Sequence, residues 1–205
     1  MVSVTSATYH HGDLPNALRR AAEEVIIEKG LGAFSLREVA RRAGVSHAAP
    51  AHHFGDMRGL LTSLAIEGFT HLEASMHEAQ LGVDDIEERF VAMGQAYVRL
   101  GMERPAHCAV MFRHDMIDDG DEELDLISYQ AFQRLEDLMI DLRDELGADF
   151  DIGDATALCW SSMQGLVQLW PSMQKISEVR GYRSIDVDEL IRRLTAFMLD
   201  GLRPR

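Results

Sequence analysis

Apolar residues recur at every third or fourth position along almost the whole chain, which is the spacing of one face of an α-helix. The first such stripe runs through residues 14–29, and Gly30 and Gly32 supply its end. Residues 172–185 are weakly patterned, and we predict that they cross between the last two helices. The pattern predicts an all-α fold of about nine helices, at residues 14–29, 35–43, 47–54, 57–79, 84–103, 105–113, 121–146, 154–170 and 186–201.

Two of these helices are short and lie on either side of one glycine. Ser35 followed by Glu38 is a capping box, in which each side chain satisfies a free amide at a helix start. Gly44 can take the left-handed conformation that ends a helix, and Ser46 is a good N-cap for the next one. The spacing therefore predicts a helix-turn-helix with a three-residue turn.

A helix-turn-helix can place its second helix in the major groove of DNA while the first crosses the backbone. Arginines on the first helix, at 37, 41 and 42, are candidates for phosphate contacts. An ordinary helical hairpin with a solvated charged face is the alternative. Pro50 falls near the fourth position of the second helix, where its missing amide predicts a distorted or 3₁₀ first turn. The polar residues predicted on or beside the second helix are Ser46, His47, His52 and His53.

Composition adds a division of charge to this picture. The chain has 205 residues, a net charge of -14 and 46% hydrophobic residues, enough to form a substantial core. Residues 1–58 hold 7 Lys and Arg against 6 Asp and Glu, whereas the rest hold 13 against 28. Five of the nine histidines, including His10 and His11, lie in the first part. We predict a near-neutral to basic head domain, residues 1–56, on an acidic body domain, residues 57–205.

Other classes of protein receive little support from the sequence. The start of the chain resembles no signal peptide, and no apolar run approaches the length of a membrane span, so we expect a soluble, cytoplasmic protein with no membrane partner. Cys108 and Cys159 are too few for a disulfide framework and are expected to be buried thiols. The acidic stretch 116–123 lacks calcium-loop spacing and is expected to be a solvated loop. No catalytic or metal-ligand spacing appears, so we expect neither an enzyme nor a cofactor.

Residues 9–69 resemble the N-terminal DNA-binding region of TetR-family transcriptional regulators. The resemblance rests on FSLREVA at 34–40, AGVS at 43–46, His53-Phe54 and Leu60-Leu61 at the start of a long helix. It implies an all-helical homodimer that binds a palindromic operator on double-stranded DNA, acts as a repressor and is released by a small ligand. The alternative is an interaction or scaffold protein that keeps this fold and has lost specific operator binding.

The resemblance also implies roles for individual residues of the head. The serines at the two helix starts and His47 would lie near phosphates, while Ala48 and Ala49 would approach bases and contact a thymine methyl. Ala51 replaces a usual tyrosine and Met57 a usual lysine, so we expect DNA binding that is weaker or more pH-dependent than is common in the family. The predicted DNA-binding residues are Ser35, Arg37, Ser46, His47, Ala48, Ala49, His52, His53 and Arg58.

The body resembles the C-terminal domain of a TetR subgroup named for a Trp-His-Gly pattern, with Gln164 in place of the histidine. Large, adaptable apolar residues here would suit a largely apolar effector, and plain core packing is the alternative for each. His107, Arg113, His114 and Gln164 are candidates to orient a polar group of the ligand. The predicted ligand-binding residues are Met93, Tyr97, Met111, Phe112, Met139, Trp160, Met163 and Gln164.

The last two long helices carry apolar and small residues on one side, which allows the homodimer that the family implies. A dimer has a mechanistic purpose, because two heads must reach major grooves about 34 Å apart. A monomer that buries these stripes internally is the alternative. The residues of the two stripes are Leu158, Ser162, Gly165, Leu166 and Leu169 on one helix, and Leu190, Ile191, Leu194, Phe197, Met198 and Gly201 on the other.

Overall fold

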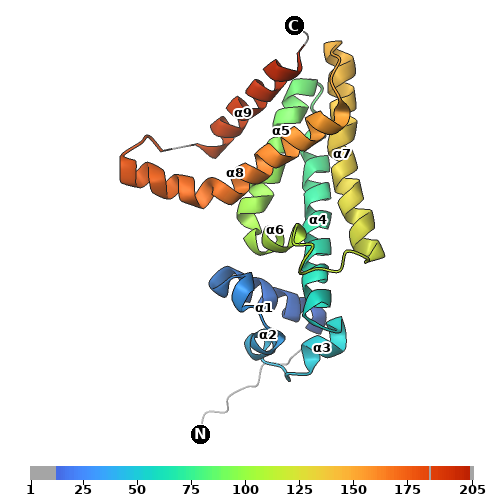
Figure 1. The fold of residues 1–205 in the computed structure, drawn as a ribbon, viewed down its shortest axis with the longest axis vertical. Coiled ribbons are helices and arrows are strands. Elements are labelled where there is room, and N and C mark those ends of the chain that lie inside the picture. Colours follow the sequence, from blue (N-terminus) through green and yellow to red (C-terminus); the bar gives the residue numbers. More distant parts are fainter. Residues whose placement is uncertain (1–12, 185, 204–205) are drawn as a thin grey trace.

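The structure is a computed structural model that describes residues 13–184 and 186–203, and this part of the chain is helical throughout with short connections (Figure 1). The predicted all-α fold is confirmed. His10 and His11 and the start of the predicted head domain lie outside the described residues. The elements are α1 (Leu14–Lys29), the 3₁₀ turn η1 (Leu31–Ala33), α2 (Leu36–Ala43), α3 (Ala49–Phe54), α4 (Met57–Gln80), α5 (Ile86–Glu103), α6 (Pro105–Met111), α7 (Glu122–Leu146), α8 (Ile152–Arg180) and α9 (Val187–Leu202).

The helix-turn-helix is formed by α2 and α3 and rests on α1. The Ser35 hydroxyl accepts a hydrogen bond from the Glu38 amide, as predicted, but the Glu38 carboxylate bonds to Lys29 and Arg41, so only half of the capping box forms. Gly44 is left-handed, with φ of 68°, and its amide closes the end of α2. The predicted stop at Gly44 is therefore confirmed, but the connection to α3 spans residues 44–48 and is longer than the predicted three-residue turn.

α3 starts two residues later than predicted. Ala48 is its N-cap and makes no side-chain capping bond, while Ser46 only accepts the Ala49 amide through its carbonyl, at 3.0 Å. This shift corrects both the Ser46 cap and the Pro50 prediction. Pro50 now lies in the first turn, where an amide has no partner within the helix, so proline fits without breaking a bond.

α4 connects the two parts of the molecule. Its N-cap Asp56 accepts the Gly59 amide at 2.9 Å directly after α3. Leu60, Leu61 and Leu64 in its first turns are fully buried in the core that the head helices share with it. Farther along, α4 runs beside α5, α6 and α7 of the body (Figure 1).

α8 is longer than predicted, because residues 172–180, which we expected to form a crossing segment, continue the helix. Pro171 lies inside it and removes one backbone hydrogen bond. The next nine residues contain no Gly or Pro and several good helix formers, so the helix resumes. It ends at Gly181, which is left-handed with φ of 65°.

α8 and α9 leave an apolar face uncovered in the single chain. Of the two predicted stripes, Leu166 and Ile191 are buried within the chain, whereas Leu158, Leu169 and Phe197 are 62%, 58% and 73% exposed. In the extended end of α8, Ile176 and Val179 are also exposed. Of the helices in the described residues, none has the length and apolar character needed to span a bilayer.

Candidate nucleic-acid interface and ligand pocket

The turn before α3 and the outer face of α3 form the exposed end of the head (Figure 1). The predicted DNA-binding residues Ser35, Arg37, Ser46, His47, Ala48, His52 and His53 are all exposed, and Ala49 is half-buried. Among the described residues Arg37 has no carboxylate partner. Most of the predicted residues are therefore accessible in the single chain, and their basic groups are three imidazoles and one guanidinium that has no carboxylate partner in the described residues.

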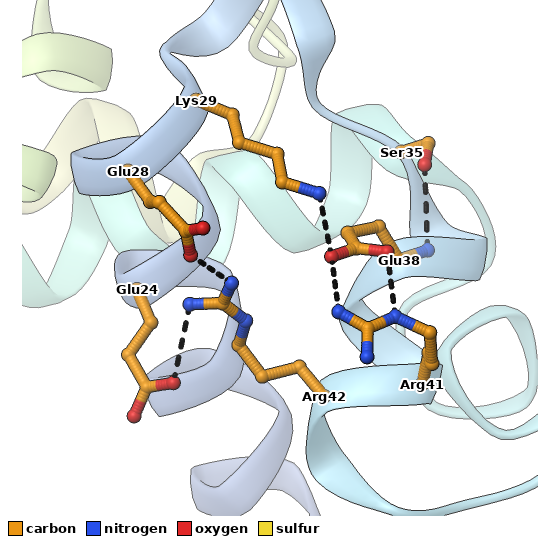
Figure 2. A network of polar contacts seen from close by, with 7 residues as sticks. All are labelled: Glu24, Glu28, Lys29, Ser35, Glu38, Arg41 and Arg42. Carbon is orange, nitrogen blue, oxygen red and sulfur yellow. Dashed lines mark hydrogen bonds and ion pairs between the residues drawn. The ribbon is translucent and has the colours of Figure 1, made fainter.

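Two other arginines of α2 are engaged inside the head (Figure 2). The Arg42 guanidinium bonds to Glu28 and lies 3.5 Å from the Glu24 carboxylate, and its side chain is only 20% exposed. Arg41 donates to Glu38 through Nε at 2.9 Å. The Arg42 pairs connect α1 with α2, which corrects the expectation that Arg42 is available to phosphates, whereas Arg41 is paired within α2 and its side chain stays 63% exposed.

Glu38 lies at the centre of this network. It accepts from Arg41 on its own helix and from Lys29 Nζ of α1 at 2.8 Å (Figure 2). Hydrogen bonds from Arg41 and then Lys29 lower the pKa of Glu38 to about 2. The carboxylate stays ionised, so it stays paired with both Lys29 and Arg41 at any physiological pH.

Arg58 is also held within the chain. Its guanidinium donates to the carbonyl of Ile117 and, at 3.1 Å, to that of Asp115, both in the segment between α6 and α7. Thr62, one turn farther along α4, accepts the Asp118 amide at 2.9 Å. The predicted phosphate contact of Arg58 would break its two bonds, so in this conformation the residue ties α4 to the body instead.

The body contains an open cavity of about 450 Å³ between α4, α7, α8 and the segment that Arg58 holds. The rings of its wall pack edge to face, with Phe69 and Phe112 centroids 5.6 Å apart and Phe112 and Trp160 centroids 6.1 Å apart. Such a volume suits a small ligand. The cavity is lined by Phe69, Met111, Phe112, His114, Ile117, Asp119, Leu124, Asp125, Ser128, Tyr129, Phe132 and Trp160.

The predicted ligand-binding residues divide between this cavity and the core. Met111, Phe112 and Trp160 line the cavity. Met93, Tyr97 and Met163 surround a space of about 20 Å³, which is too small for an effector, and Met139 is fully buried. In the structure Met93, Tyr97, Met139 and Met163 are therefore core residues and do not line the cavity. The reason is that α5 and the inner faces of α7 and α8 pack closely there.

Gln164 lies at the border of core and cavity. Its Oε1 accepts a hydrogen bond from the Tyr97 hydroxyl at 2.9 Å. The Gln164 side chain also lines a shallow hollow next to Trp160. Burial raises the pKa of Tyr97, so the hydroxyl remains a donor. The bond fixes Tyr97 against Trp160, whose ring centroid is 5.4 Å from that of Tyr97. Gln164 therefore positions an aromatic neighbour of the cavity.

Several cavity residues were missed by the sequence reasoning. Asp125, Tyr129 and Phe132 have the spacing i, i+4, i+7, which places them on one face of α7, and this spacing is visible in the sequence. The 116–123 segment is also more than a solvated loop, since Ile117 is buried and Asp119 lines the cavity. Of the residues expected to orient a ligand, only His114 reaches the cavity wall, where Nδ1 lies 2.8 Å from Asp119.

His107 occupies a different place, at the junction of head and body. It is fully buried on α6 between Glu23 of α1 and Glu67 of α4, with each carboxylate 3.8 Å from a ring nitrogen. That distance is too long for a hydrogen bond, and neither nitrogen has another partner among the described residues. Burial lowers the pKa of His107, and burial followed by the nearby Glu67 charge raises that of Glu23.

The two cysteines carry no reactive site in this arrangement. Both are buried, and burial raises the pKa of each thiol to about 11. A thiol in that state is a weak nucleophile. Within the described residues, no group of three or more His, Cys, Asp or Glu side chains is placed to hold a metal ion.

The exposed helix-turn-helix at one end and the cavity-bearing helical body define the class of all-helical proteins with a helix-turn-helix domain. Residues 18–64 match the model of bacterial regulatory proteins of the tetR family, and residues 90–198 match that of the tetracyclin repressor-like C-terminal domain. The chain belongs to the TetR family of transcriptional regulators. The finer resemblance to the Trp-His-Gly subgroup stays a prediction.

Solved structures share the fold over nearly the whole chain. A tetR-family regulatory protein from Rhodococcus RHA1 is 20% identical with a TM-score of 0.75, covering 95% of this chain and 99% of that one. PfmR from Thermus thermophilus is 20% identical, with a TM-score of 0.71 and coverage of 97% and 100%. The fatty acid degradation regulator FadR from Bacillus halodurans is 17% identical, with a TM-score of 0.74 and coverage of 96% and 100%. No curated protein sequence matches the chain.

Proposed function

We propose that this TetR-family chain is a repressor that binds a palindromic operator as a homodimer and is released when a small ligand enters the body. The observation that carries the proposal is the exposed surface of the turn and α3 in the head. Arg37 of α2, His47 of the turn and His52 of α3 offer donors to phosphates, and Ala48 offers a methyl group to bases. The predicted domain limits, 1–56 and 57–205, fit a head that binds DNA and a body that binds the ligand.

The uncovered face of α8 and α9 supports the homodimer. Soluble chains rarely leave several large apolar side chains exposed on neighbouring helices unless they cover a partner. A second copy packed on Leu158, Leu169 and Phe197 would bury them and fix the distance between the two heads. That distance decides whether both α3 helices reach successive major grooves.

The contacts of Arg58 and Thr62 supply a route from ligand to DNA. The segment that they hold carries Ile117 and Asp119, which line the cavity. A ligand that displaces this segment would release the first turns of α4, which lead directly into α3. The ligand can shift the dimer away from DNA only by its difference in affinity for the two arrangements.

A second candidate function is a scaffold that has lost specific operator binding. The pairing of Arg41 and Arg42 inside the head favours it, as do the exposed Ala51 and Met57 where the family usually has polar anchors. Such a protein would keep the fold and the cavity while making few phosphate contacts.

A pull-down of genomic DNA fragments at low salt, followed by titration of the best fragment at two salt concentrations, separates the two candidates. A regulator recovers a short palindrome with saturable, salt-sensitive binding, because neutralised phosphates release counterions. Recovery of only unspecific DNA would contradict the repressor proposal and favour the scaffold.

A further inference from the structure

The cavity of the body has an aromatic interior and an acidic mouth. Five of its lining residues are aromatic, and three of them form one wall in which Trp160 contacts Phe112 on one side and Phe132, at 5.5 Å between centroids, on the other. Tyr129 stands 59% exposed beside the opening. An apolar or aromatic ligand body would find large flat partners here.

The charge around this cavity has one sign. Asp119 and Asp125 line it, and neither Lys nor Arg does. His114 is the one basic lining residue, and it is already paired with Asp119. The Asp125 carboxylate has no hydrogen bond or ion pair in the described part of the chain. Residues 115–125 contain seven Asp and Glu, of which Asp115 is paired with Arg113 and Asp121 caps α7, so the acidic character of the cavity lining comes from Asp119 and Asp125.

We propose that the effector of this cavity is an organic cation, an ammonium group on an apolar or aromatic body. A cation is attracted by the faces of aromatic rings and pairs with Asp125 as it enters. A carboxylate or phosphate ligand would instead meet like charge with no basic partner, and a neutral ligand would cover Asp125 without compensating it. The proposal rests on the ligand-responsive function proposed above and names the ligand class of the same cavity.

Calorimetric titration of the purified protein at physiological salt tests this with three probes of similar apolar body: 4-phenylbutyltrimethylammonium, 4-phenylbutanol and 5-phenylpentanoate. We expect the cation to bind with one site per chain and about threefold to tenfold more tightly than the alcohol, the range for an exposed ion pair with added ring contacts. The carboxylate should bind most weakly. A carboxylate that binds as tightly as the ammonium would overturn the proposal, as would no binding of the ammonium.

Variants place the binding in the cavity. Asp125→Asn should remove the preference for the ammonium over the alcohol, and Trp160→Leu should weaken both. Asp137→Asn, an equal charge change at an exposed position of the same helix outside the cavity, is the matched control and should change neither. Equal loss of affinity in the Asp125 and Asp137 variants would mean unspecific attraction to the acidic surface and overturn the proposal.

The outcome of this titration is independent of the DNA experiment. If a palindrome is recovered and the ammonium does not bind, only the ligand class is wrong. If the ammonium binds in the cavity and no palindrome is recovered, the ligand class stands and the repressor proposal is wrong.

Discussion

The head and the body of this protein treat charge in opposite ways. In the head, Arg41, Arg42 and Lys29 are neutralised by glutamates of α1 and α2, and the pairs connect the two helices (Figure 2). In the body, the two acidic residues that line the cavity have no Lys or Arg beside them in its lining, and the Asp125 carboxylate has no hydrogen bond or ion pair in the described residues. Charged side chains therefore stabilise the contact of α1 with α2 in the head. At the cavity of the body they leave a carboxylate that can bind a ligand.

The comparison shows why the net charge of -14 is a poor guide to the partners of this chain. What matters for DNA is the set of cations left unpaired on the surface of α3 and the preceding helix, which is small. What matters for the effector is the set of anions left unpaired around an aromatic cavity. Mutations in each region test these assignments, beginning with the largest expected effect.

The first prediction tests whether the uncovered face of α9 forms the homodimer. Phe197→Glu places a charge on the uncovered face of α9, so we expect a monomer of 23.0 kDa in sedimentation experiments. Because two linked heads gain from effective concentration, DNA affinity should fall by about 10²-fold or more. Ile140→Glu, on α7 away from this face, is the control. A dimer that survives Phe197→Glu contradicts the proposed interface.

The second prediction tests the connection between the two regions. Arg58→Met removes the guanidinium that holds the carbonyls of Asp115 and Ile117. We expect the ammonium probe to bind as before, while its effect on DNA affinity shrinks by about fivefold or more, the lower range of allosteric coupling. The measurement is DNA titration with and without saturating probe, with Arg99→Met on α5 as control. A full ligand response in Arg58→Met would show that the coupling runs elsewhere.

The third prediction compares two arginines of α2. Arg37 is exposed and unpaired in the described residues, so Arg37→Ala should leave the melting temperature unchanged and weaken DNA binding. Because each head of the dimer would then neutralise one phosphate fewer, the slope of log affinity against log salt should become shallower by about 2. Arg42→Ala, which breaks pairs with Glu24 and Glu28, should lower the melting temperature instead. Equal salt slopes for Arg37→Ala and the unchanged protein would remove Arg37 from the interface.

The elements of the fold were predictable because their signals are local. Ser35 and Gly44 mark the two ends of α2 through bonds to residues within four positions, and the structure contains both. The segment after Pro171 was predicted to cross between helices because its apolar pattern is weak, whereas its helix formers continue α8 in the structure. The one hydrogen bond lost at Pro171 does not end α8, which continues to its C-cap at Gly181.

The cavity was harder to predict because its wall comes from α4, α6, α7, α8 and one connecting segment. Met139 and Trp160 are similar in sequence terms, since both are large and lie on an apolar face of a long helix. Only the packing of neighbouring helices decides that Met139 is fully buried while Trp160 faces open space. The network of Arg42 was hidden for the same reason, because its partners lie on another helix 14 and 18 positions earlier.

The last and smallest effect concerns the junction where head and body meet. The buried His107 ring lies between Glu23 and Glu67, with His71 and Arg104 also nearby. Because burial lowers the pKa of His107, the unfolded chain binds more protons below about pH 6.5, and this group makes stability rise with pH through that window. The raised pKa of Glu23 acts in the opposite sense, since its contribution is complete below its ordinary pKa of 4.5 and is lost as the pH rises.

Replacing His107 tests this balance. His107→Leu removes two buried nitrogens without partners in the described residues, so we expect a gain of about 1 kcal/mol in the free energy of unfolding at pH 5.5 and a smaller gain at pH 8. Glu23→Gln should remove the opposing dependence and leave stability rising more steeply with pH. Urea unfolding of both variants at the two pH values measures each contribution. If His107→Leu loses stability most at pH 5.5, protonated His107 pairs with the two carboxylates, and the junction stabilises the contact of head and body through charge.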